Sequence, residues 1–125
     1  MSPQHEGKAL AMETNALNFF HIVSEQNWEA ARLAGEYRAN TLETEGFMHC
    51  SYARQLVATA GRYYPEPGGY LVLTVAPDRV TSEIKLEMAS IGEIFPHIYG
   101  PLNIEAVVGV EALSEVLKRL TSETA

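Results

Sequence analysis

Three of the four histidines in this sequence follow a phenylalanine at the same spacing. The three segments read Phe-Phe-His, Phe-Met-His and Phe-Pro-His, and they end at His21, His49 and His97. Because residues i and i+2 of a β-strand share one face, each imidazole lies beside a phenyl ring if its segment is extended. An imidazole titrates near neutral pH and can act as a general acid or base. We therefore expect the three segments to converge on one cleft, with these histidines as its catalytic groups.

Two other interpretations of the histidines stay open. Each could be a half-buried polar side chain that fixes a loop, which is a common position for histidine. Together, three imidazoles could bind a catalytic zinc ion that keeps an open fourth position. The spacings of 28 and 48 residues between them match no short metal-ligand motif, so the metal site is the less favoured of the two.

Tyr99 and Ser51 are polar neighbours of two of these histidines. On an extended segment, Tyr99 shares a face with His97, and Ser51 shares one with His49. Either hydroxyl could contact a ligand in the same cleft. Ser51 is also placed to cap a following helix, which would explain it without a ligand. Both are predicted ligand-binding residues.

Arg38, Glu87 and Glu93 are the charged candidates for the site. Arg38 follows a predicted helix and could bind a phosphate or a carboxylate. A surface ion pair would explain Arg38 at least as well, and the glutamates in reach are Glu36, Glu43 and Glu45. Glu87 and Glu93 are candidate acids near the later strands, with Glu87 taken as a ligand-binding residue. The alternative for both is a carboxylate that is only solvated.

The single cysteine, Cys50, lies between His49 and Ser51. A cysteine at the start of a helix could be a reactive thiolate. Strand alternation, however, points Cys50 away from both of its neighbours. A small buried side chain is therefore the favoured role of Cys50.

Six short strands are predicted from clusters of aromatic and β-branched residues bounded by turn residues. They cover 17–23, 47–51, 70–76, 84–88, 94–100 and 106–110. The run at 70–76 is almost continuously apolar, which indicates a central strand. Pro96 and Pro101 bracket much of the fifth segment. Since proline cannot donate to a strand ladder, we expect that segment at a sheet edge or outside the sheet.

Three helices are predicted around these strands. The first runs from a Ser24 cap to Gly35, where a glycine can end a helix. The second starts at a Ser51 cap and ends before a proline- and glycine-rich break at 64–69. Ser114 caps the third.

Length and composition indicate one globular domain. The chain has 125 residues, of which 46% are hydrophobic and 20% charged. The strands do not alternate regularly with helices, which disfavours a doubly wound parallel sheet. We expect a single small α+β domain at 17–125, with mixed, mostly antiparallel short strands and two to three helices. Residues 1–16 are polar and unpatterned and are predicted to be a flexible N-terminal tail.

The net charge and the lengths of the apolar runs limit the binding partners and the cellular location that we expect. A net charge of −7 without any run of Lys and Arg argues against binding to nucleic-acid polymers or anionic membranes. No apolar run approaches the roughly 18 residues that a membrane span needs. The apolar stretch 9–12 is too short for a signal peptide, and a single cysteine cannot form an internal disulfide. We therefore expect a cytoplasmic protein, with its oligomeric state left open.

Four segments of the chain carry the signature of a known family. They are 20–23 with Trp28, 35–38, 45–51 and 95–102. Together they resemble the bacterial and plant "domain of unknown function 952" family, over about residues 17–113. That family has no established activity. Its members resemble the ADP-ribosyltransferase fold, a mixed α+β domain that also includes toxins, poly-ADP-ribose polymerases and an RNA 2′-phosphotransferase.

The ADP-ribosyltransferase-like fold implies roles for several residues. In such enzymes a His or Arg on the first strand grips the NAD ribose, an aromatic ring stacks on the nicotinamide, and a late-strand Glu orients the ribose 2′-hydroxyl. By this resemblance His21 takes the first role, and His49 and Ser51 line the second wall of the cleft. The late segment offers His97 and Tyr99 in place of the glutamate, which leaves transferase activity open.

Two function classes follow, with a third less favoured. The first is an enzyme that binds NAD or a related phosphorylated nucleotide and acts as an ADP-ribosyl- or phospho-transferase. The second is a non-catalytic nucleotide-binding module on the same fold. The third is a His-ligated metal hydrolase. NAD is thus the possible cofactor, and a small nucleotide-like molecule is the expected partner.

Overall fold

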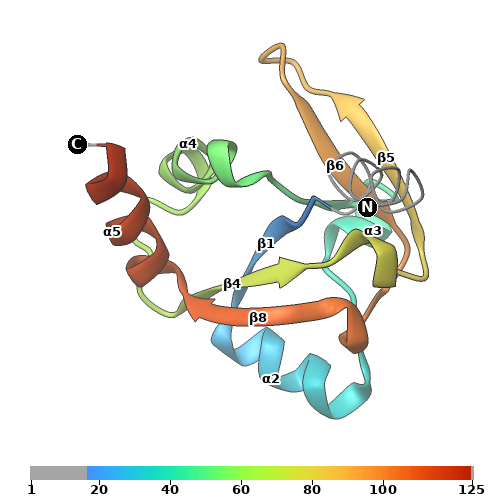
Figure 1. Ribbon diagram of the computed structural model, residues 1–125. Coiled ribbons are helices and arrows are strands. Elements are labelled where there is room, and N and C mark those ends of the chain that lie inside the picture. Colours follow the sequence, from blue (N-terminus) through green and yellow to red (C-terminus); the bar gives the residue numbers. More distant parts are fainter. Residues whose placement is uncertain (1–16, 125) are drawn as a thin grey trace, which may run out of the picture.

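The computed structural model of the protein describes residues 17–124, so the tail predicted at 1–16 lies outside the described residues. This part of the chain is a small α+β domain of short antiparallel strands, as predicted (Figure 1). The helices are α2 (Glu25–Ala34), α3 (Thr41–Thr44), α4 (Ala53–Tyr63) and α5 (Leu113–Thr124). The strands are β1 (Phe19–Ser24), β2 (Glu36–Tyr37), β3 (Met48–His49), β4 (Tyr70–Val75), β5 (Glu83–Met88), β6 (Ile94–Tyr99), β7 (Leu102–Asn103) and β8 (Val107–Ala112). Short 3-10 turns, η1 (Pro77–Arg79) and η2 (Ile104–Ala106), join some of them.

The strand β4 is the centre of a three-stranded antiparallel sheet with the order β1-β4-β8. The apolar run at 70–76 predicted this position, because both faces of β4 are covered. Val72 packs on one face with residues of α4 and α5, whereas Leu73 and Val75 pack on the other with residues of α2. Figure 1 shows α4 and α5 on one side of this sheet and α2 on the other.

The strand β6 is the centre of a second sheet, ordered β3-β6-β5, so the prediction that 94–100 lies at an edge or outside a sheet is wrong. Pro96 lies within β6 and its carbonyl accepts a hydrogen bond from the Cys50 N–H at 3.0 Å. Both backbone groups of a strand residue point to the same neighbour, so the missing N–H of Pro96 also faces β3. β3 ends at His49, so Pro96 lies at the position where the hydrogen-bond ladder between β3 and β6 ends.

The first helix follows its predicted boundaries. The Ser24 hydroxyl accepts a hydrogen bond from the Asn27 N–H at 3.1 Å, and Gly35 ends α2 with a φ of 90°. That left-handed conformation is one that glycine adopts without steric cost. Within residues 17–124, no helix combines the length and the apolar character that a membrane span requires.

The other two helices start at different residues from those predicted. α4 begins at Ala53, and Ser51 does not cap it. Ser51 is instead paired with Phe20 in an antiparallel bridge, so the backbone is still extended where the cap was expected. α5 begins at Leu113, one residue before the predicted cap Ser114. Both differences arise because strand pairing, a tertiary contact, sets where the chain turns into a helix.

The phenylalanines of the Phe-x-His segments differ in burial. Phe19 is only 2% exposed and belongs to the main core, whereas Phe47 and Phe95 are half-buried. Replacing Phe19 by Ala is therefore expected to lower the free energy of unfolding by about 3–5 kcal/mol, the range for a buried phenylalanine. Phe95→Ala is expected to cost clearly less. Urea unfolding followed by the fluorescence of buried Trp28 measures both losses, and equal losses would contradict this interpretation of the core.

Candidate functional site

The β3-β6-β5 sheet carries a cluster of rings on one face. His49 of β3 lies opposite His97 of β6, and the centroids of the two imidazoles are 5.2 Å apart. The ring of Phe47 stacks on His97 with a centroid distance of 4.1 Å and lies 5.2 Å from the ring of Tyr99. Because strand residues alternate between faces, the Phe-x-His spacing brings these rings together. With two residues of β5, the cluster forms what we call the imidazole face: Phe47, His49, Lys85, Glu87, His97 and Tyr99.

Glu87 connects the side chains of this face. Its Oε1 accepts hydrogen bonds from the Tyr99 hydroxyl at 2.6 Å and from Nδ1 of His97 at 2.7 Å. These bonds, with that from Tyr99 the stronger influence, hold the pKa of Glu87 below its ordinary value, so the carboxylate is ionised at neutral pH. The bond to Glu87 in turn raises the pKa of Tyr99 to about 12. Nζ of Lys85 lies 4.5 Å from the centroid of the Tyr99 ring.

Each of the two facing imidazoles is held by a carboxylate through one nitrogen. His97 donates from Nδ1 to Glu87, since an ionised carboxylate can only accept. Nε2 of His49 lies 3.0 Å from Oε1 of Glu45. Neither Nε2 of His97 nor Nδ1 of His49 makes a hydrogen bond to another residue of the segment 17–124. The side chain of His49 is 53% exposed and that of His97 10%, so His49 is the more open of the two.

His21 is buried on β1, in the other three-stranded sheet, and does not lie on this face. Its Nδ1 is 2.7 Å from the backbone carbonyl of His49, and its Nε2 is 3.1 Å from the hydroxyl of Tyr37. A carbonyl only accepts, so Nδ1 carries the hydrogen, and Nε2 accepts from the Tyr37 hydroxyl. Burial lowers the pKa of His21 to about 4, and the imidazole is neutral at pH 7. Both ring nitrogens are thus used inside the protein.

The structure brings His21, His49 and His97 into one connected group, with Tyr99 and Glu87 beside them. It does not add Arg38 or Ser51 through any hydrogen bond. Arg38 is exposed and pairs with Glu36 at 3.7 Å. Ser51 is buried, with its hydroxyl 3.2 Å from that of Thr59.

Cys50 has the buried position expected of it. It is 3% exposed within the main core, and burial raises the pKa of its thiol. Within residues 17–124, no group of three or more histidine, cysteine, aspartate and glutamate side chains is arranged to hold a metal ion.

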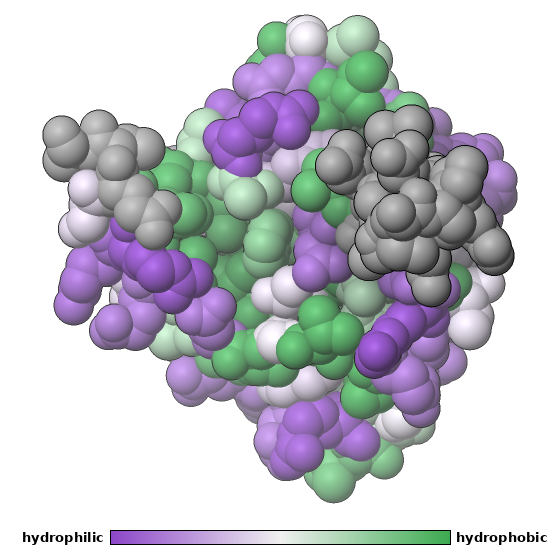
Figure 2. Space-filling model, in the orientation of Figure 1, coloured by the Kyte–Doolittle hydropathy of each residue, from purple (hydrophilic) through white to green (hydrophobic). Residues whose placement is uncertain are grey.

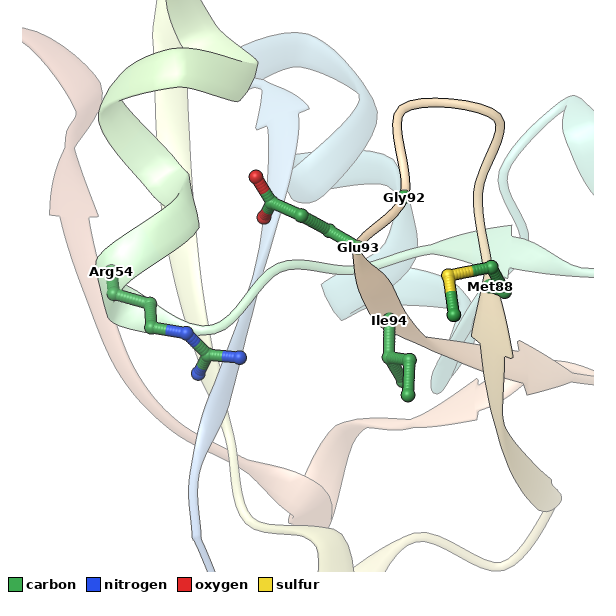
Figure 3. Close-up of a pocket in the computed structure, with 5 residues that line it drawn as sticks. All are labelled: Arg54, Met88, Gly92, Glu93 and Ile94. Atoms are coloured by element: carbon green, nitrogen blue, oxygen red, sulfur yellow. The ribbon is translucent and has the colours of Figure 1, made fainter.

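The second candidate acid, Glu93, lies away from the imidazoles. It lines an open depression of about 450 Å³ between the start of α4 and the β5–β6 hairpin, together with Arg54, Met88, Gly92 and Ile94. Figure 3 shows Arg54 on one side of this depression and Met88 and Ile94 on the other. Met88 and Ile94 alternate with the residues of the imidazole face, so the depression belongs to the opposite face of the sheet.

Sequence reasoning assigned neither Glu45 nor Lys85 nor Tyr37 to the site. For two of these residues the sequence contained a pattern that could have placed them at the site. Glu45 stands four residues before His49. Lys85 stands two residues before Glu87 on an alternating strand, which places Lys85 and Glu87 on one face. For Tyr37 the sequence contained none, because its contact with His21 joins elements that no local pattern relates.

A comparison with protein families matches residues 22–110 to the family described as "Protein of unknown function (DUF952)". The chain belongs to this family. Among solved structures it is similar to protein CC0527 from Caulobacter crescentus. The crystal structure of that protein has a TM-score of 0.69 and 26% identity, covering 74% of this chain and 82% of that one. Its solution NMR structure has a TM-score of 0.67 and 26% identity, covering 77% and 84%. No curated protein matches the sequence.

In this member of the family, His21 is expected to make stability depend on pH. Burial lowers its pKa from 6.5 to about 4, so the unfolded chain takes up a proton that the folded chain refuses. The contribution of the neutral His21 imidazole to the free energy of unfolding is complete above pH 6.5. It falls as the pH drops from 6.5 to 4 and changes no further below pH 4. Between pH 7.5 and 5, the free energy of unfolding is expected to lose about 2 kcal/mol through this group.

Urea unfolding of the protein and of the His21→Gln variant at pH 7.5 and pH 5 measures this effect. The variant is expected to be less stable at pH 7.5 but to lose about 2 kcal/mol less between the two pH values. An unchanged pH dependence in the variant would show that His21 is not held neutral by burial.

Proposed function

We propose that the imidazole face is an acid–base site that acts on a small phosphorylated nucleotide, with NAD and related molecules as the first candidates. The observation that carries the proposal is the pair His49 and His97. Their rings lie 5.2 Å apart, each is held by a carboxylate, and each has one nitrogen without a partner in the segment 17–124. Two imidazoles this close together can act on one reacting centre, one as a general base and the other as a general acid.

The carboxylates give the two imidazoles different roles in this proposal. Glu87 accepts from Nδ1 of His97 and stabilises the imidazolium that forms when Nε2 takes a proton, so His97 is the general base. His49 is the more open ring and is the general acid, which gives a proton to the leaving oxygen when a phosphoryl group is transferred. In a phosphoryl transfer, His97 would remove the proton of the attacking hydroxyl while His49 protonates the departing oxygen. In an ADP-ribosyl transfer from NAD, His97 would again remove the proton of the attacking hydroxyl, and nicotinamide would depart as a neutral molecule without a proton from His49.

The nucleotide part of the proposal is supported by the resemblance to the ADP-ribosyltransferase fold and by two features of the face. A transferase of that kind presents a late-strand glutamate, and Glu87 reaches His97 and Tyr99 from the neighbouring strand. Lys85 supplies a cation next to Tyr99. Because Glu45 and Glu87 oppose added negative charge, the site favours a ligand with few phosphates over a long polyanion. Arg38, which is exposed and pairs with Glu36 at 3.7 Å outside this face, is kept in the proposal as a second cation that a phosphate could reach.

Titration of the protein with NAD, ADP-ribose and AMP, followed by NMR and by assay of NAD consumption, tests the proposal. Saturable shifts are expected at His49, His97 and Tyr99. Consumption of NAD is expected to fall by about 100-fold or more in the Glu87→Gln variant, the range for loss of general acid–base catalysis. The matched control is Glu29→Gln on α2, which removes an exposed carboxylate remote from the face and should leave the rate unchanged.

Two outcomes would count against the proposal. Saturable binding without turnover would favour the non-catalytic nucleotide-binding module. No response to millimolar NAD, ADP-ribose or AMP, with a clear response to an unrelated small molecule, would remove the nucleotide as ligand.

A further inference from the structure

The strand β5 has one unpaired edge. In the order β3-β6-β5 it hydrogen-bonds to β6 alone among the strands described within 17–124. Two of its apolar side chains are unusually open for their size: Leu86 is 59% exposed and Met88 is 65% exposed. Figure 2 shows hydrophobic residues at the surface at the top of the view, where Figure 1 places the β5–β6 hairpin. An exposed, apolar edge strand is a template for pairing with another strand.

The hairpin geometry shows which backbone groups of β5 point outward. The N–H of Ala89 donates to the carbonyl of Glu93 at 2.8 Å, so the backbone of Ala89 faces β6. Because these groups alternate along a strand, the N–H and C=O groups of the even-numbered residues face the open edge. The residues concerned are Ile84, Leu86 and Met88.

We propose that β5 pairs with β5 of a second copy of this chain, antiparallel about a two-fold axis that passes through Leu86. In this register Leu86 meets Leu86 of the second copy, and Ile84 meets its Met88. All of these residues have outward-facing backbone groups, so the ladder closes with hydrogen-bonded pairs. Between them, at the positions where side chains come closest, Lys85 of each copy meets Glu87 of the other. Opposite charges directly across an antiparallel pair are stabilising.

The charge pattern of β5 distinguishes this register from its neighbour. If the axis passed through Lys85, the two Lys85 residues would face each other and Glu83 would face Glu87. Like charges directly opposite are destabilising. Both registers pair the outward-facing backbone groups of even-numbered residues with one another, so the side-chain charges distinguish them. The charge pattern of β5 therefore selects the register with the axis through Leu86.

Pairing in this way has a consequence for the imidazole face. Lys85 and Glu87 belong to that face, whereas Ile84, Leu86 and Met88 lie on the other side of the sheet. A two-fold dimer would join two β3-β6-β5 sheets into one six-stranded sheet with both imidazole faces on the same side. Lys85 of the second copy would then stand next to the Glu87 carboxylate. Dimer formation would therefore be coupled to the ionisation of the Glu87 carboxylate.

Sedimentation equilibrium of the full chain tests the dimer. The wild-type protein is expected to approach twice its 13.8 kDa as its concentration rises toward the millimolar range. Leu86→Lys places two like charges at the axis, and we expect it to raise the dissociation constant about tenfold or more. The control is Leu33→Lys on α2, an equally apolar side chain that is 81% exposed and lies outside the interface; it should not change the constant.

A charge reversal tests the register independently. Lys85→Glu is expected to weaken the dimer about tenfold, because glutamates then face each other across the axis. Adding Glu87→Lys to that variant is expected to restore the wild-type constant. Hydrogen exchange supplies an internal comparison: the amides of Leu86 and Met88 should gain protection as the concentration rises, whereas that of Glu87 should not.

Three results would overturn the inference. One is a wild-type protein that stays at 13.8 kDa at millimolar concentration. Another is a dimer that Leu86→Lys does not weaken. The third is protection of the Leu86 amide that is independent of concentration, which would show that another part of the same chain covers this edge.

Discussion

The hydrogen bond from His21 to the backbone of β3 supports the arrangement of this protein's candidate site. The imidazole of His21, on β1, donates from Nδ1 to the backbone carbonyl of His49 on β3 at 2.7 Å. The strand β3 has only two residues, so its ladder with β6 is short. The His21 bond, together with the two backbone bonds between Phe20 and Ser51, attaches β3 to the central sheet. The position of the His49 side chain relative to His97 depends on this attachment.

The environment divides the three histidines into two kinds. His21 is surrounded by protein, and burial lowers its pKa to about 4, so it stays neutral and uses both nitrogens for structure. His49 and His97 each face a carboxylate and keep one nitrogen without a partner in the segment 17–124. The same residue type with the same Phe-x-His spacing therefore gives one imidazole with both nitrogens bonded inside the protein and two imidazoles that each keep one nitrogen open within residues 17–124.

Much of this arrangement follows from alternation along strands. The spacing at 47–49 predicts neighbouring rings on one face, and the contact between the rings of Phe47 and His49 confirms it. What the sequence could not supply was the partner of each strand. The central position of Pro96 depends on where β3 stops, and the choice of Glu87 over Glu93 depends on the register of β5 against β6. The extended backbone at Ser51 depends likewise on its bridge to β1.

The protonation pattern of the histidine rings tests the central claim most directly. Long-range ¹H–¹⁵N correlation spectra distinguish a protonated from an unprotonated ring nitrogen in each imidazole. His21 is expected to show a hydrogen on Nδ1 and none on Nε2 throughout pH 5.5–8, and His97 to carry its hydrogen on Nδ1 at the high end of that range. A His21 ring with its hydrogen on Nε2, or one that becomes charged within that range, would contradict the account.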